Sequence, residues 1–124
     1  MTPYEALGGE AVLQQLTARF YETMDGLPEA KACRAIHPAD LGPARQKLFE
    51  YLSGWLGGPP LFTDKYGPPM LRRRHLPARI GAEEAEGWLI CFRKAWAETV
   101  EDAALTAQIM PQIEALGLHM INAG

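Results

Sequence analysis

The sequence predicts an all-α protein. Apolar residues recur every three or four positions through several long stretches, which is the period of an amphipathic helix. Glycine and proline residues separate these stretches, and we find no convincing run of the two-residue alternation that marks a half-buried strand. We therefore expect the chain to fold as a set of helices joined by breaks rich in glycine and proline.

Two helices are predicted in the first half of the chain. The first covers residues 8–24 and is entered through a glycine pair, with an apolar stripe of Val12, Leu13, Leu16, Phe20 and Met24. A turn at residues 25–30 and a short segment up to residue 43 follow, where prolines interrupt regular structure. The second helix covers residues 43–55 and ends at the breakers Gly57 to Pro60. Its stripe comprises Leu41, Ala44, Leu48, Leu52 and Trp55.

The second half is predicted to hold one long loop and two long helices. Residues 57–70 are so rich in glycine and proline that we expect an ordered loop, and loops of this length are usually functional. Residues 71–75 allow about one helical turn before a proline. A strong helix is expected over residues 81–100, and a last one over residues 103–122, in which Pro111 marks a kink or the true start. The inward positions of the last helix are Leu105, Ile109, Ile113, Leu116 and Met120.

Composition limits the class of protein. The 124 residues, 48% of them hydrophobic, suit one globular domain over residues 1–124. A formal net charge of −3 and a pI near 5.6 argue against a general nucleic-acid binder. Cys33 and Cys91 form no metal or redox motif, and we expect reduced core thiols in a cytoplasmic protein. Neither an export signal nor an apolar run of about 18 residues is present, so no membrane insertion is expected.

His75 is one of three histidines and follows three arginines in the stretch MLRRRHLPARI, residues 70–80. Such an imidazole can be a metal ligand, a pH switch, or a half-buried side chain with a satisfied hydrogen bond. The cluster of Arg72, Arg73, Arg74 and Arg79 can face an anionic group of a ligand or only solvent. Several helices around a loop and a lone histidine suggest a core built around a ligand, although a plain helical bundle has the same pattern.

Five motifs in order give a more specific indication. They are YEALGGE, RFYETM, WLGGPPLFTDKYG, LRRRH and EGWLICF. Together they resemble the truncated haemoglobins of group II, the O-type, over nearly the whole chain, and His75 and Trp88 keep that family's spacing of 13 residues. The resemblance implies a truncated globin fold, a two-on-two helical sandwich around haem b.

The resemblance also implies roles for individual residues. His75 matches the proximal ligand of the iron, and Lys47 and Arg74 match the cationic partners of the haem propionates. Further haem contacts are expected from Leu48, Leu52, Phe62, Leu71, Ile80 and Trp88. On the ligand side, Tyr21 and Trp88 match hydrogen-bond donors. The other expected distal residues are Phe20, Ala44, Leu48 and His37, the last in place of the commoner phenylalanine or tyrosine.

The function implied is reversible binding of dioxygen and other diatomic gases at a five-coordinate iron, for oxygen storage or transport. Alternatives are a redox enzyme that removes nitric oxide or peroxide with the help of a reductase, and a gas sensor, because all of these share the same iron and donors. A helical interaction module without haem is a further alternative. We expect a cytoplasmic monomer or homodimer with no nucleic-acid partner.

Overall fold

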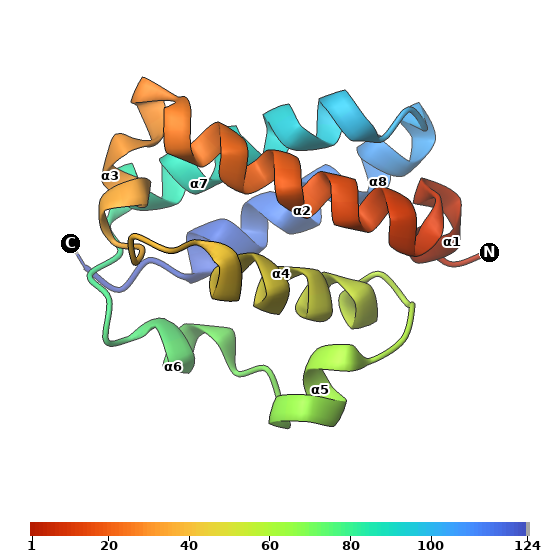
Figure 1. Cartoon of the computed structure of the whole chain (residues 1–124), viewed down its shortest axis with the longest axis horizontal. Coiled ribbons are helices and arrows are strands. Elements are labelled where there is room, and N and C mark those ends of the chain that lie inside the picture. The colour runs from red at the N-terminus through yellow and green to blue at the C-terminus, as the bar shows by residue number, and fades with distance from the viewer. Residues whose placement is uncertain (124) are drawn as a thin grey trace.

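The computed structural model describes residues 1–123, which are helical and contain no strand, so the predicted all-α class is confirmed (Figure 1). The long helices agree with the predicted ranges to within a few residues. The helices are α1 (Pro3–Leu7), α2 (Gly9–Gly26), α3 (Lys31–Ala35), α4 (Gly42–Trp55), α5 (Leu61–Tyr66), α6 (Leu71–His75), α7 (Ala82–Thr99) and α8 (Ala103–His119), with a 3-10 turn η1 (Pro28–Ala30) before α3.

The core lies between two pairs of long helices. Helix α2 packs on both α4 and α7, and α7 also packs on α8, which is the expected two-on-two arrangement (Figure 1). Phe92 is the centre of an aromatic stack, with ring centroids 5.4 Å from Trp88 and 6.0 Å from Trp96. Phe20 of α2 meets this stack edge-on, 6.1 Å from Phe92, so aromatic packing fixes α2 against α7.

Helix α1 was not predicted, although the sequence carries a signal for it. The Thr2 hydroxyl accepts a hydrogen bond from the Glu5 backbone N–H, and the Glu5 carboxylate accepts one from the Thr2 N–H, which together form a capping box. The glycine pair Gly8 and Gly9, at φ 120° and 74°, then turns the chain into α2. The pair is therefore a junction between two helices.

The prediction of a loop over residues 57–70 is wrong in its middle, where α5 forms. The Pro60 carbonyl accepts the Asp64 N–H at 3.0 Å, and the helix ends at Gly67, whose φ is 82°. Prolines that come directly before a helix do not disturb it, since the first N–H groups of a helix lack partners within it. Phe62 is buried by this turn, and the burial of its ring favours a helix too short to form alone.

Helix α8 continues through Pro111, so this proline does not mark its start. Pro111 is exposed, and the buried residues Leu105, Ile109 and Ile113 lie along one face on both sides of it. Leu116 and Met120 continue the apolar residues toward the C-terminal end, where they are only half-buried. No helix among residues 1–123 has the length and apolar character needed to cross a membrane.

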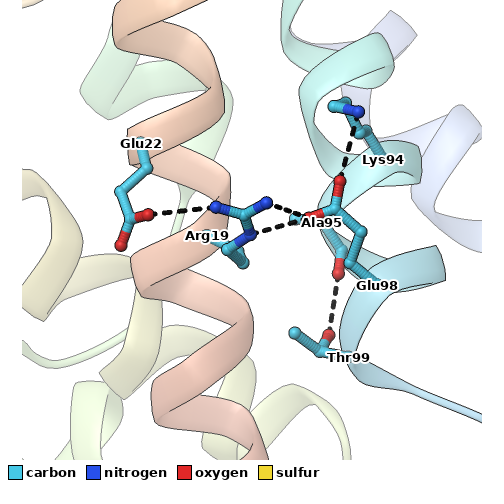
Figure 2. A network of polar contacts seen from close by, with 6 residues as sticks. All are labelled: Arg19, Glu22, Lys94, Ala95, Glu98 and Thr99. Atoms are coloured by element: carbon cyan, nitrogen blue, oxygen red, sulfur yellow. Dashed lines mark hydrogen bonds and ion pairs between the residues drawn. The ribbon is translucent and has the colours of Figure 1, made fainter.

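An ion-pair network links α2 to α7 at the surface (Figure 2). The Arg19 guanidinium donates from Nε to Glu98 at 2.6 Å and pairs with Glu22 at 3.2 Å, while Lys94 pairs with the other oxygen of Glu98 at 3.2 Å. Exposed pairs of this kind contribute little to the free energy of unfolding, so the network adds little to the packing of α2 on α7.

At Gly87, helix α7 lies close to η1 and α3. A Cβ added there would lie 3.1 Å from Cys33 Cβ and 3.2 Å from Ala30 Cα. We expect Gly87→Ala to lower the free energy of unfolding by about 1 kcal/mol, because an overpacking cost of about 1 to 3 kcal/mol exceeds a helix-propensity gain of about 1 kcal/mol. Urea unfolding followed by circular dichroism measures the change.

The matched control is Gly26→Ala at the end of α2, where an added Cβ meets nothing within 4 Å. This variant should be at least as stable as the parent, because it gains helix propensity without a steric cost. Equal stability of Gly87→Ala and the parent would show that the approach of α7 to α3 tolerates a methyl group.

Candidate functional site

A cavity of about 550 Å³ opens between the helices, and α2 through α8 all contribute to its walls. This volume lies within the range of about 300 to 1,000 Å³ that is typical of cofactor and small-molecule sites. Most of the expected site residues meet here: Tyr21, His37, Ala44, Lys47, Leu48, Phe62, Leu71, Arg74, His75, Ile80 and Trp88. Phe20 and Leu52 do not line it, because both face the core.

His75 stands at the end of α6 on the exposed side of the cavity. Its Nδ1 lies 2.6 Å from the Leu71 carbonyl oxygen. A carbonyl only accepts hydrogen bonds, so Nδ1 carries the proton and Nε2 of the neutral ring keeps its lone pair. An imidazole whose other nitrogen donates to a backbone carbonyl is the usual form of a histidine that binds a metal. No cluster of three or more His, Cys, Asp or Glu side chains within residues 1–123 could hold an ion.

Two cations line the same cavity on its exposed side. The Arg74 guanidinium donates from Nη2 to the backbone carbonyls of Tyr66 and Pro68, both at 3.0 Å, and lies 5.2 Å from the centroid of the Phe62 ring. The Lys47 ammonium lies 5.7 Å from the centroid of the Tyr66 ring. These positive charges beside largely apolar walls suit an apolar ligand that carries anionic groups at one edge.

Arg72 and Arg73 are exposed and do not line the cavity. Arg79 forms an ion pair with Glu84, Nη1 to Oε1 at 3.7 Å. The same Glu84 oxygen accepts the Gly81 backbone N–H at 2.7 Å and so caps α7. Of the four clustered arginines, therefore, only Arg74 reaches the cavity.

Tyr21 and Trp88 present polar hydrogens at the cavity wall. The Tyr21 hydroxyl donates to the Ala44 carbonyl over a long 3.4 Å, and burial raises the pKa of this hydroxyl well above its ordinary value, so it stays protonated. The indole N–H of Trp88 has no hydrogen-bond partner among the described residues, whereas that of Trp96 donates to Thr106 Oγ1 at 2.7 Å. Phe20 lies behind both, 4.7 Å from the Tyr21 ring and 5.4 Å from the Trp88 ring.

His37 is half-buried at the cavity wall, with its ring centroid 6.1 Å from that of Tyr21. Its Nδ1 lies 2.8 Å from the Cys33 carbonyl oxygen and must donate to it, which leaves only the Nε2 lone pair in the neutral ring. Burial lowers the pKa of this imidazole despite that hydrogen bond. His37 is thus an acceptor near neutral pH.

Several wall residues were missed by the sequence analysis. Leu116 and Met120 were expected to point inward, but as part of an ordinary core. Tyr66 was assigned to a loop, whereas α5 directs its hydroxyl to the buried Glu50 carboxylate at 3.1 Å, where Lys65 also donates at 3.2 Å. The remaining wall residues without a prior assignment are Cys33, Ile36, Tyr51, Ala78, Glu84, Ala85 and Gly117. Cys33 and Cys91 are free and buried, and burial raises the pKa of Cys33 to about 12.

Comparison with known proteins places these features in a family. The family model described as bacterial-like globin matches residues 2–122. A group 2 truncated haemoglobin of Bacillus subtilis is 39% identical over 120 residues, which cover 97% of this chain and 88% of that protein.

Solved structures agree with this match. A group II 2-on-2 haemoglobin of Agrobacterium tumefaciens is 54% identical with a TM-score of 0.98, over 100% of this chain and 96% of that one. A cold-adapted truncated haemoglobin of Pseudoalteromonas haloplanktis is 42% identical with a TM-score of 0.96, over 100% of both chains.

We expect His37 to titrate below its ordinary pKa of 6.5, because burial disfavours the charged ring and the Arg34 guanidinium adds unfavourable positive charge. The unfolded chain then binds this proton more readily than the folded chain. The free energy of unfolding should therefore fall as the pH drops below about 6.5, and this loss should be smaller in His37→Phe.

The measurement is urea unfolding of both proteins between about pH 5 and about pH 7.5, supported by NMR titration of the ring. A parent and a variant that lose the same stability over this range would contradict a buried neutral His37.

Proposed function

The chain belongs to the bacterial-like globin family, as a haem-binding truncated haemoglobin of group II, and from this premise we propose that it binds dioxygen reversibly at haem b held by His75. The observation that carries the proposal is an imidazole whose Nδ1 is bound to a backbone carbonyl, which leaves Nε2 for a metal, in a large and mostly apolar cavity that two cations also line. The other histidine of the cavity, His37, also donates from Nδ1 to a backbone carbonyl, but it lies beside the Tyr21 ring, whereas His75 directly follows the cation Arg74 in sequence.

The wall chemistry fits haem. The macrocycle is flat and apolar, and side chains such as Leu48, Leu71 and Ile80 offer it apolar contacts. Its two propionates need cationic partners, a role we assign to Lys47 and Arg74. Arg74 keeps further N–H donors for this purpose, because its hydrogen bonds to backbone carbonyls use only Nη2. When bound, haem supplies an iron with a coordination position open to a diatomic gas.

We assign the stabilisation of dioxygen to Tyr21 and Trp88. The indole N–H of Trp88 lacks a partner within residues 1–123, so it can donate to a ligand without first giving up another hydrogen bond. The Tyr21 hydroxyl holds only a long hydrogen bond to Ala44, and exchanging it for a shorter one to a ligand costs little. Ala44 itself leaves room beside these donors.

The cellular location, oligomeric state and partners of the protein are part of the same proposal. We place this single globin domain, residues 1–124, in the cytoplasm, because free buried thiols suit a reducing compartment. There it would carry or store oxygen as a monomer or homodimer, and a reductase would be a partner if the protein acts as a redox enzyme.

Replacement of His75 by glycine tests the iron ligand. The purified parent should show an intense Soret band, and His75→Gly should lose stable haem or recover it only with added imidazole, because the other histidine of the cavity, His37, lies beside Tyr21 among the proposed ligand-side residues. The measurement is the absorption spectrum of the ferrous protein, with and without imidazole. His119→Gly is the control, since His119 is exposed at the end of α8.

Unchanged ferrous spectra in His75→Gly would overturn the assignment of the iron ligand. A parent that takes up no haem on titration would instead support the alternative of a haem-free helical module.

Loss of the indole donor should accelerate the release of dioxygen. We expect Trp88→Phe to raise the dissociation rate constant about tenfold or more, as follows from the loss of one hydrogen bond of about 1.5 kcal/mol. Stopped-flow displacement of dioxygen measures this constant. Trp55→Phe is the control, because Trp55 lies on α4 and does not line the main cavity. If Trp88→Phe released dioxygen at the parental rate, Trp88 would serve packing only.

A further inference from the structure

The C-terminal tail crosses the connection that follows His75. After α8 ends, residues 121–123, which we name the C-terminal strap, run beside the segment between α6 and α7 (Figure 1). The Ile80 carbonyl accepts the backbone N–H groups of both Asn122 and Ala123, at 2.8 Å and 3.1 Å. Arg72 of α6 adds a hydrogen bond from Nη2 to the Ile121 carbonyl at 3.4 Å.

The side chain of Asn122 forms the centre of these contacts. Its Oδ1 accepts the Ile80 backbone N–H at 2.9 Å, while its Nδ2 donates to the Ala78 carbonyl at 2.9 Å and to the His75 carbonyl at 3.4 Å. One carboxamide thus satisfies a donor and two acceptors of a single short segment. An aspartate could make only the first of these bonds, because a carboxylate has no N–H to donate.

The start of segment 75–80 is held by little packing, whereas its end has the buried Ile80 and the ion pair of Arg79 with Glu84. Helix α6 has five residues, too few to be stable alone, and none of its side chains is buried. Leu76, directly after His75, is 52% exposed, and the next residue is a proline without a backbone N–H. Arg74 ties the helix to the loop before it, and the strap provides the ties on the other side.

We propose that Asn122 is a positioning residue for His75, and that the C-terminal strap thereby controls the bond between His75 and the haem iron and the rate at which haem leaves. The inference rests on the proposed function of His75. Asn122 is the only asparagine of the chain and lies 47 residues from His75, so no local pattern relates the two.

Two substitutions distinguish the hydrogen bonds that Asn122 donates from the one that it accepts. In the haem-loaded protein, Asn122→Ala should raise the rate constant of haem transfer to excess apomyoglobin about tenfold, which corresponds to about 1.4 kcal/mol. It should also shift or broaden the iron–histidine stretching band in the resonance Raman spectrum and speed amide hydrogen exchange at Ile80. Asn122→Asp should lose haem at least as fast but keep the protection of the Ile80 amide, since its carboxylate still accepts that N–H.

Thr2→Ala is the control, because it removes the hydrogen bonds of the Thr2 hydroxyl that cap α1, a helix remote from His75 (Figure 1), at a stability cost of about 1 kcal/mol. It should leave haem transfer and the iron–histidine band unchanged. Parental haem transfer and an unshifted band in Asn122→Ala, or equal changes in Thr2→Ala, would overturn the inference. The His75→Gly spectra test separately whether the parent binds haem through His75. If it does not, the proposed function fails, and this inference fails with it.

Discussion

The hydrogen bond between Nδ1 of His75 and the Leu71 carbonyl is the contact on which the site depends, because it fixes the tautomer and leaves Nε2 free. This imidazole is carried by a five-residue helix without a buried side chain, so packing cannot hold it. Polar ties replace packing: Arg74 binds carbonyls before α6, and Asn122 binds carbonyls after it. A histidine held in this way is accessible from solvent and still has a defined orientation.

The opposite wall is held by packing. Trp88 stacks on Phe92, and Phe20 contacts Trp88 and Tyr21 edge-on, all within the two longest helices. Side chains on rigid helices keep their positions more accurately than those on short segments. The donors of the cavity are therefore set by the core, whereas the expected iron ligand is set by surface hydrogen bonds, and a change at one wall need not disturb the other.

The sequence predicted the long helices well, because a 3.6-residue period becomes clear only over many residues. Helix α5 was missed for the same reason, since its six residues between breakers show no period and their helix depends on burying Phe62. The family resemblance indicated most of the cavity residues but placed Phe20 and Leu52 there too, and both face the core. The contacts of Asn122 span 42 to 47 residues, and only the folded chain brings these groups together.

The hydrogen-bonding role of His37 in the cavity depends on its protonation state. Tyr21 and Trp88 are donors at neutral pH, whereas the neutral His37 ring gives its N–H to the Cys33 carbonyl and offers only a lone pair. It becomes a third donor only after protonation, and its lowered pKa moves that event to more acidic pH. Near neutral pH, therefore, a histidine at this position gives the cavity no more hydrogen-bond donors than a phenylalanine would. Tyr21 and Trp88 are the donors in either case. In acid His37 adds a positive charge to the cavity wall, which would favour an electron-rich ligand bound there.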